Sequence, residues 1–569
     1  ILLGSSMVGK TSAIKLLKAA MPELKKNSMF LPRHFKDFVD NKVETHIINT
    51  KAYSYERLYG RFSAFDDSWQ PGYVEKILVE AGDSINKNNQ VWLIFDGPID
   101  SDWMEYLNSA LDDTRKLSVS NGKSVLVPES FRFIFESDNA NSCTPASISR
   151  CGTIYIGQEE VGWQAYLSAW FTKFDTGDSP GQVKGKRKLT HQQSLSSLSS
   201  KKKKSKRLIR RQSMETLNFR LENHHKTNDI SMSARHKSHL EALCEWILQP
   251  CFTFLDIHIK DHLINVPDCA KRVDRVTKLM TMILKNTYSD RILKETSFWR
   301  GKTEDVPELT QDDIECIFIF AIIWGFGIDL DPVGKTMFST FVKSFCEDAD
   351  YIYKHEIYKI LTDNYGWSNL GIELSIPFPT SISSLYELYY DPITKDWITW
   401  KSSLVVPETS PTIRNFHSIL VPVEATVSYD FFARNCVQHD LPMLLLGNSG
   451  SGKSTHVKHF LHEQLNKKQF MSFSLQFSRN TEVKHLTHKI HEHLDKSQKG
   501  VLLPKNDLKC IIFIDDMHMS KCDDHNIQAP LELIRSIIDY GGWYNENFEF
   551  QKLKKVNFMS IYIVCIFAK

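Results

Sequence analysis

Two glycine-rich segments of this chain match one eight-residue pattern, G-x-x-x-x-G-K-[ST]. The first runs from Gly4 to Thr11 and the second from Gly447 to Ser454. Each follows a short apolar run and opens an amphipathic stretch, so each is expected to join a β-strand to a helix. In such a turn the backbone N–H groups converge on phosphate oxygens at a helix N-terminus, where the dipole favours negative charge. The sequence therefore predicts two phosphate-binding loops.

The residues of the loops have separate expected roles. Lys10 and Lys453 would reach the β and γ phosphates of ATP, or the β phosphate of ADP, and the hydroxyls of Thr11 and Ser454 would lie on Mg²⁺. The predicted nucleotide-binding residues are Gly4, Gly9, Lys10, Thr11, Gly447, Gly450, Gly452, Lys453, Ser454 and Thr455. The alternative, a glycine-rich turn without a ligand, stays open for either loop.

A metal-holding acid is expected at the end of a neighbouring strand, and each loop has one candidate. Asp96 ends "VWLIFD" and Asp515 ends "CIIFID". Hydrolysis further needs a carboxylate beside that acid to polarise water, normally Glu. Gly97 offers none, so the first site is expected to bind nucleotide without appreciable turnover. Asp516 offers a carboxylate on a stem about 1.5 Å shorter, which predicts slow hydrolysis, since a displacement near 1 Å can cost roughly 100-fold in rate.

Hydrophobic periodicity divides the chain into five segments. Residues 1–157 alternate strand-like runs with helical patterns, which predicts a parallel α/β sheet. Residues 158–174 form a connection, and residues 175–236 are rich in Ser, Lys, Gln and His, which predicts a disordered insertion. Residues 237–400 show helical spacing, as in Leu240, Leu243, Cys244 and Ile247, and are expected to form a helical lid and connection. Residues 401–569 repeat the opening α/β design.

Composition limits the classes of function. Eleven cysteines without a C-x-x-C pair indicate neither a zinc ribbon nor a secreted disulfide framework, and a reducing compartment fits best. The longest apolar stretch, Ile314 to Ile328, is shorter than the roughly 20 residues of a membrane span and reads as a buried helix. Net charge is +2, and twelve Lys and Arg lie between residues 184 and 211. The rest of the chain is net acidic, so neither membrane nor nucleic acid is an expected partner.

Several stretches around the loops resemble the second and third AAA+ modules of dynein heavy chains, more the axonemal than the cytoplasmic type. They are "IINTKAYSYERLYG", "FDGPIDSDWMEYLNSALDDTRKL", "TPASISRCGTIYI", "FIFAIIWGFGIDLD", "ILVPVEATVSY" and "FIDDMHM" followed by "QAPLELIRSIIDYGGWYN". The resemblance spans nearly the whole chain apart from residues 175–236. It implies tandem P-loop AAA+ modules, each a parallel αβα sheet with a helical lid.

The resemblance also implies roles that the residues alone do not show. Arg150 would be an arginine finger serving the first module's site, with a plain surface arginine as the alternative. The expected activity is ATP-driven, minus-end-directed movement along microtubules in the cytoskeleton of a cilium axoneme. The expected partners are the remaining heavy-chain modules, intermediate and light chains, and microtubules through parts outside this chain. A non-motor pseudo-ATPase scaffold derived from a dynein gene, and a different tandem AAA+ machine, are the rival interpretations.

Three further features of the sequence give weaker predictions. The closing "NFMSIYIVCIFAK" departs from the family pattern, so the third module is expected to stop before its sensor strand, finger and lid. The residues His485, His488, His491 and His493 are expected on a solvated helix face, with a metal site as the alternative. The basic insertion is expected to be a solvated linker, with a polyanion tether as an alternative that phosphorylation of Ser213 would weaken.

Overall fold

The computed structural model divides the chain into two compact units. Described are residues 1–26, 42–63, 66–83, 89–175, 230–264, 268–288, 309–348, 350–404 apart from 369, 371, 373, 375, 380 and 381, 421–498 and 500–563. The first unit takes in the described residues of Ile1–Val161 and Tyr429–Lys569, and the second those of Gly162–Thr409 and Val421–Ser428. Both phosphate loops lie in the first unit. The predicted insertion, residues 175–236 with Ser213, falls largely outside the described residues.

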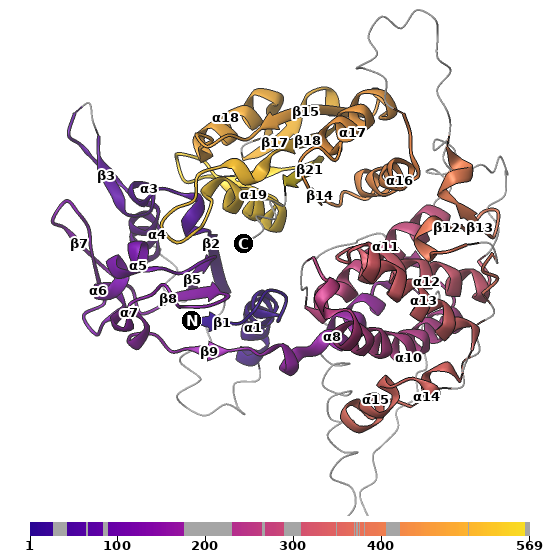
Figure 1. Cartoon of the computed structure of the whole chain (residues 1–569). Coiled ribbons are helices and arrows are strands. Elements are labelled where there is room, and N and C mark those ends of the chain that lie inside the picture. Colours follow the sequence, from indigo (N-terminus) through magenta and orange to yellow (C-terminus); the bar gives the residue numbers. More distant parts are fainter. Residues whose placement is uncertain are drawn as a thin grey trace, which may run out of the picture. The chain divides into compact units, whose positions relative to one another are not determined.

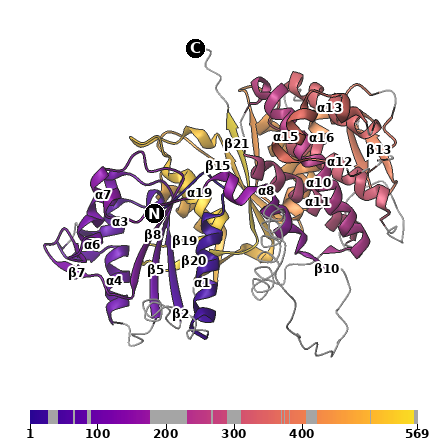
Figure 2. The same ribbon diagram turned by 90° about the horizontal axis from the view of Figure 1, so that it is seen from below.

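Residues 1–161, named here the N-terminal α/β part, contain a five-stranded parallel sheet (Figures 1 and 2). Its order is β2-β5-β8-β1-β9, and every neighbouring pair is parallel. The strands are β1 (Leu2–Leu3), β2 (Lys42–Ile48), β5 (Asn89–Asp96), β8 (Phe131–Ser137) and β9 (Ile154–Tyr155). The strands expected from the apolar runs are therefore confirmed.

Strand β5 shows why this sheet is covered on both faces. Leu93 and Phe95 belong to a core that includes residues of α4 (Tyr73–Asp83), whereas Trp92 and Ile94 pack with Ile14 of α1 (Lys10–Lys26). Alternate residues of a strand point to opposite faces, so a strand between two helical layers needs an unbroken apolar run. The continuous "VWLIF" meets that need.

Shorter elements complete the N-terminal α/β part. They are η2 (Thr50–Ala52), α3 (Tyr55–Tyr59), β3 (Gly60–Phe62), β4 (Trp69–Pro71), α5 (Ser101–Met104), η3 (Glu105–Leu107), α6 (Asn108–Leu111), β6 (Lys116–Ser118), β7 (Ser124–Leu126) and α7 (Pro145–Ser149). Helix α8 (Gln158–Phe171) follows and is broken at Gly162, whose φ is 67°.

Residues 429–563, named here the C-terminal α/β part, contain a second parallel sheet with the order β14-β21-β18-β15. Its strands are β14 (Met443–Gly447), β15 (Phe470–Gln476), β18 (Lys509–Asp515) and β21 (Val556–Ile563). Strand β21 lies between the strand before the phosphate loop and the strand that ends at Asp515, as β8 does in the other sheet. The expectation that this module stops before that strand was wrong, because "VNFMSIYI" is apolar enough to fill the gap.

The two faces of the second sheet are also covered. Ile512 and Ile514 pack in a core with residues of α18 (Val483–His493) and α19 (Ala529–Tyr540), while Phe513 packs with α16 and α17 on the other face. The remaining elements are α16 (Glu424–Gln438), α17 (Lys453–His459), η9 (Phe460–Gln464), η10 (Lys505–Asp507), η11 (Met517–Met519) and a small sheet ordered β16-β17-β20-β19. The strands of that small sheet are β16 (Leu494–Gln498), β17 (Val501–Pro504), β19 (Gly542–Tyr544) and β20 (Phe550–Leu553).

The second unit is mainly helical (Figure 1). Its longer helices are α10 (Ala234–His258), α11 (Cys269–Tyr288), α12 (Gln311–Gly327) and α13 (Pro332–Glu347). It also contains β10 (Phe174–Asp175), β11 (Ile230–Ser231), η5 (Lys260–His262), α14 (Tyr351–Lys354), α15 (Ile357–Tyr365), η6 (Leu385–Glu387), the hairpin β12 (Leu388–Asp391) and β13 (Asp396–Thr399), and η7 (Trp400–Ser403). Among the described residues, no helix is both long and apolar enough to cross a bilayer.

Helix α12 confirms the predicted buried helix, and its N-terminus is fixed by a buried acid. Nearly all of its residues from Asp313 to Gly327 are buried. The Asp313 carboxylate accepts hydrogen bonds from the backbone N–H and the hydroxyl of Thr310, at 2.7 and 2.8 Å, and from the Tyr390 hydroxyl at 2.5 Å. The Lys395 ammonium lies 3.2 Å away. Burial acts to raise the pKa of Asp313, but these partners outweigh it and the pKa is lowered.

Replacement of this acid should destabilise the chain in a pH-dependent manner. We expect Asp313→Ala to lower the free energy of unfolding by about 2–3 kcal/mol, because the capping box with Thr310 loses its carboxylate and buried donors lose their acceptor. The folded pKa lies below the unfolded value of about 3.9, so the contribution is complete above that pH and is lost as the pH falls below it. Urea unfolding at several pH values measures this.

The exposed neighbour Asp312, in the same turn, provides the matched control. Asp312→Ala should change the free energy of unfolding by less than about 0.5 kcal/mol. Equal effects of the two variants at neutral pH would contradict the role of the Asp313 carboxylate in the capping box.

Candidate functional site

The first phosphate loop connects β1 to α1 and approaches the backbone of its neighbour closely. Gly4 has a φ of 151°, and a Cβ on it would lie 2.4 Å from the backbone oxygen of Ile156. Only glycine fits this approach. The Lys10 ammonium is buried and donates to the backbone oxygens of Gly4 and Ser5 and to Asp138 Oδ1 at 2.9 Å. The lysine is thus placed at the centre of the loop.

The hydroxyl of Thr11 meets an acid that the sequence analysis did not select. Thr11 Oγ1 donates to Glu136 Oε1, and Glu136 is at the end of β8, between the loop strand and β5. Burial raises the pKa of Glu136, the Thr11 hydroxyl opposes the rise, and the nearby charge of Asp96 adds to it. The signal was available, because "FRFIFE" ends in an acid after an apolar run just as "VWLIFD" does.

Asp96, the predicted metal ligand, pairs with Glu136 in the sheet register. Its carboxylate, however, is bound by residues of the C-terminal α/β part. Arg535 Nη1 lies 3.1 Å from Asp96 Oδ2, and Arg535 Nη2 donates to the backbone oxygen of Asp96 at 2.9 Å. The Tyr540 hydroxyl donates to the same carboxylate oxygen. The structure thus brings Thr11 to Glu136 and brings Asp96 to Arg535. The metal role of Asp96 stays a prediction.

The residue after Asp96 has a backbone conformation that favours glycine and close side-chain neighbours. Gly97 has a φ of 151°, and a Cβ on it would lie 3.2 Å from Asn49 Oδ1 and 3.4 Å from Arg535 Nη2. A larger residue here would therefore be strained and would press on both neighbours.

The second phosphate loop connects β14 to α17 with the same internal geometry. The Lys453 ammonium donates to the backbone oxygens of Gly447, at 2.9 Å, and Asn448. Ser454 Oγ donates to Asp515 Oδ1 at 2.8 Å, so the predicted hydroxyl and acid do meet here. Lys458 lies 3.3 Å from the other oxygen of Asp515. Gly450 and Gly452 have φ values of 79° and 80°, and Thr455 is exposed in the first turn of α17.

Asp516 follows Asp515 in an unusual backbone conformation. Its φ of 54° lies in the left-handed region, which costs energy for a residue with a side chain. Its Oδ2 accepts a hydrogen bond from Gln476 Nε2 at 3.2 Å. Gln476 ends β15, which lies on the side of β18 away from the phosphate loop. The carboxylate is thus bonded away from the loop.

Arg150, the predicted arginine finger, has partners within its own part of the chain. It ends α7, its Nε lies 2.5 Å from Asp112 Oδ1, and its Nη1 donates to the backbone oxygen of Ala146 at 2.6 Å. These bonds hold the guanidinium at the surface of the N-terminal α/β part. The finger role stays a prediction.

The four histidines of α18 do not gather into a ligand set. His488 pairs with Glu492 at 3.3 Å, His491 packs on Trp543 and His493 stacks on Phe473. His485 is exposed. Among the described residues, the group that could hold a metal ion is instead Asp100, Asp102 and His525.

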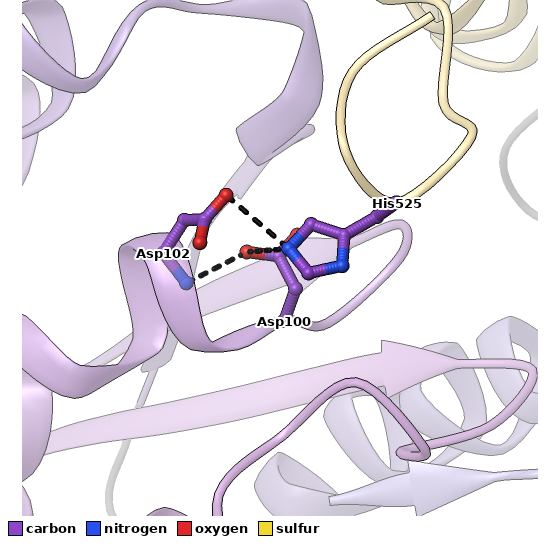
Figure 3. Close-up of side chains that lie close together, drawn as sticks. All are labelled: Asp100, Asp102 and His525. Carbon is purple, nitrogen blue, oxygen red and sulfur yellow. Dashed lines mark hydrogen bonds and ion pairs between the residues drawn. The ribbon is translucent and has the colours of Figure 1, made fainter.

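Figure 3 shows the His525 ring facing Asp102 and Asp100 across the junction of the two α/β parts. His525 Nε2 lies 3.2 Å from Asp102 Oδ2 and 4.0 Å from Asp100 Oδ1. The Lys51 ammonium already lies 2.6 Å from Asp100 Oδ2 and 2.8 Å from Asp523 Oδ2. Burial acts to lower the pKa of Lys51, but these carboxylates outweigh it and the pKa is raised. A lysine thus supplies the positive charge that the buried Asp100 needs, and the cluster ties the two parts together.

Comparison with known proteins assigns the family. A family model described as the P-loop containing dynein motor region matches residues 408–563, and one described as the dynein heavy chain AAA lid domain matches residues 240–402. Together they cover more than half of the chain. The chain belongs to the dynein heavy chain family. The second phosphate loop and both acids after it lie within the motor-region match.

Individual relatives extend the similarity over nearly the whole chain. Dynein axonemal heavy chain 12 of Mus musculus is 24% identical over 555 residues, which are 96% of this chain and 15% of that protein. Dynein axonemal heavy chain 3 of Homo sapiens is 25% identical over 547 residues, 96% of this chain and 11% of the relative. Dynein axonemal heavy chain 1 of Homo sapiens is 25% identical over 564 residues, which are 98% of this chain and 11% of that protein. The chain thus spans between a tenth and a sixth of these relatives.

The buried Lys51 generates a prediction about the junction. Lys51→Met should lower the free energy of unfolding by about 3–5 kcal/mol, because Asp100, whose side chain is 1% exposed, would keep a buried charge without its partner. Thermal or urea unfolding of the whole chain measures the loss. Lys76, which reaches the backbone oxygen of Asn547 at 3.3 Å from an exposed position, is the matched control. Lys76→Met should cost less than about 1 kcal/mol, and similar losses for the two variants would contradict the role of Lys51.

Proposed function

We propose that this chain is part of a dynein motor ring and binds ATP or ADP with Mg²⁺ at both phosphate loops. The first loop is a nucleotide site without hydrolysis, and the second is a slow hydrolytic site with a regulatory role. The observation that carries the proposal is the residue after each strand-end acid. It is Gly97 at the first site and Asp516 at the second.

The donor atoms suit magnesium at both sites. The first offers the Thr11 hydroxyl with the carboxylates of Glu136 and Asp96, and the second offers the Ser454 hydroxyl with Asp515. Mg²⁺ prefers such oxygen ligands, and when bound it would supply positive charge that offsets the negative charge of the phosphates. Lys10 and Lys453 would turn from the loop carbonyls to the phosphates.

Support for inactivity of the first site comes from the surroundings of Gly97. Glycine has no side chain that could polarise water, and Asn49 and Arg535 lie against the position that a Cβ would take. Bound nucleotide would then hold the module in one conformation instead of being consumed.

Support for slow hydrolysis at the second site comes from the position of Asp516. Its carboxylate is shorter than that of Glu and is bonded to Gln476 on the far side of the strand. General-base catalysis needs the carboxylate within hydrogen-bond reach of the attacking water. A turnover step would therefore begin with release of Asp516 from Gln476.

The wider assignment follows from the relatives. Their names place them among axonemal dynein heavy chains, which supports second and third modules of a motor ring, movement along microtubules in a cilium axoneme, and partnership with the other heavy-chain modules and with intermediate and light chains. In this assignment Arg150 serves the nucleotide site of a preceding module. A non-motor scaffold derived from a dynein gene is the second candidate, and the weakened acids at both sites favour it.

Loss of either loop lysine should remove one bound nucleotide. We expect the chain to bind two nucleotides, and Lys10→Ala and Lys453→Ala each to bind one, because the ammonium no longer balances the phosphate charge. Equilibrium dialysis with a fluorescent ADP analogue counts them. ATP turnover should persist in Lys10→Ala and disappear in Lys453→Ala. Turnover lost in Lys10→Ala alone would contradict the assignment of the active site.

Lengthening the second acid should speed hydrolysis. Asp516→Glu should raise kcat by about tenfold or more, because the added methylene lengthens by about 1.5 Å the reach of the carboxylate once it is released from Gln476. Steady-state release of phosphate measures the rate. Asp516→Asn, which keeps the shape and loses the base, is the paired control and should abolish turnover. A rate unchanged in both variants would favour the scaffold.

A further inference from the structure

Arg535 and Tyr540 belong to helix α19 of the C-terminal α/β part, yet both bind the acid that ends β5 of the N-terminal α/β part. We propose that they form a latch on Asp96 that competes with Mg²⁺ at the first nucleotide site and so makes that site responsive to the second. This inference rests on the proposed nucleotide binding and adds a regulator to it.

The contacts of Asp96 explain why latch and metal compete. Its side chain is 12% exposed, and one carboxylate oxygen receives both the Arg535 guanidinium and the Tyr540 hydroxyl. A magnesium ion takes its oxygen ligands at about 2.1 Å in a nearly ideal octahedron. The ion would have to share the Asp96 carboxylate with the Arg535 guanidinium, and the two positive charges repel each other. Metal binding through Asp96 therefore favours an open latch.

The guanidinium of Arg535 is held in place by further acids. Glu532 Oε2 lies 3.0 Å from its Nε, and Asp539 Oδ2 lies 3.3 Å from its Nη1. Asn49 in turn donates to Glu532 at 2.6 Å. Burial acts to lower the pKa of Arg535, but Asp96 and Glu532 outweigh it and the pKa is raised. These contacts hold the guanidinium of Arg535 in position to pair with Asp96.

The path from the latch to the second site is short. Residues 517–528 join Asp516 to the start of α19. Within this segment Gln528 Nε2 donates to the backbone oxygens of His518 and Ser520, at 2.8 and 2.5 Å. A shift of Asp515 or Asp516 on nucleotide binding is therefore carried to α19. Because coupling is reciprocal, metal at the first site would also change affinity at the second.

The test uses the full chain with Lys453→Ala, so that a fluorescent ADP analogue reports the first site alone. Titration with Mg²⁺ at fixed nucleotide gives the metal concentration at half-saturation. We expect Arg535→Gln to lower that concentration about fivefold or more, with little change in affinity when EDTA replaces the metal. Tyr540→Phe, which keeps the ring and loses only the hydroxyl, should shift it in the same direction by a smaller factor.

The matched control is Arg57→Gln. Arg57 also crosses the junction, where it donates to the backbone oxygen of Asn545 at 2.7 Å, but it does not contact Asp96. This variant should leave the magnesium midpoint unchanged. Equal shifts for Arg57→Gln and Arg535→Gln, or no shift for Arg535→Gln and Tyr540→Phe, would overturn the latch and leave Arg535 as a structural contact.

A second measurement tests the coupling. In the chain with both loops intact, filling the second loop with ATP should move the magnesium midpoint of the first, and Arg535→Gln should remove that response. A midpoint that responds equally in both chains overturns the link through α19. If the Lys453→Ala chain binds no nucleotide at all, the proposed function fails together with the latch, whereas binding with an unaltered midpoint defeats the latch alone.

Discussion

The parallel alignment of strands is the constraint on which both sites depend. In a parallel sheet the carboxyl ends of all strands lie at one edge, and ligands bind there. This places the first phosphate loop, Asp96 and Glu136 together at the ends of β1, β5 and β8. It places the second loop beside Asp515 in the same manner. The helices on both faces make that alignment possible, because they bury the backbone and side chains of strands such as "VWLIF".

Buried charge then fixes how the two α/β parts meet. Lys51 lies between Asp100 and Asp523, and Arg535 lies among Asp96, Glu532 and Asp539. The pairs Lys51–Asp523 and Arg535–Asp96 cross the junction, so each of these two ion pairs needs both parts of the chain. The junction is therefore specific and not merely apolar, and one of its ion pairs engages an acid of the first nucleotide site.

The two sites share a phosphate loop and a strand-end acid, and they differ in the residue that follows this acid. Gly97 follows the strand-end acid of the first, and Asp516, whose carboxylate accepts a hydrogen bond from Gln476, follows that of the second. We propose on this basis that nucleotide at the first site is a structural element and that nucleotide at the second is a signal. The helix α19, which begins after the second site and ends near the first, is suited to carry that signal.

The sequence by itself determined the parallel sheets, the buried helix α12 and the positions of both phosphate loops, because these depend on local periodicity and on glycines that permit one backbone geometry. It did not reveal strand β21 as the missing neighbour of β14, since that segment departs from the family pattern and only its place in the sheet shows its role. Nor did it reveal the pairing of Thr11 with Glu136 or of Asp96 with Arg535. Those partners lie 125 and 439 residues apart, and pairing at such a distance is decided by the packing of one sheet against another part of the chain. Only the tertiary structure could decide these pairs, because the hydrogen-bond partner of a carboxylate is known only when folding has brought the two groups together.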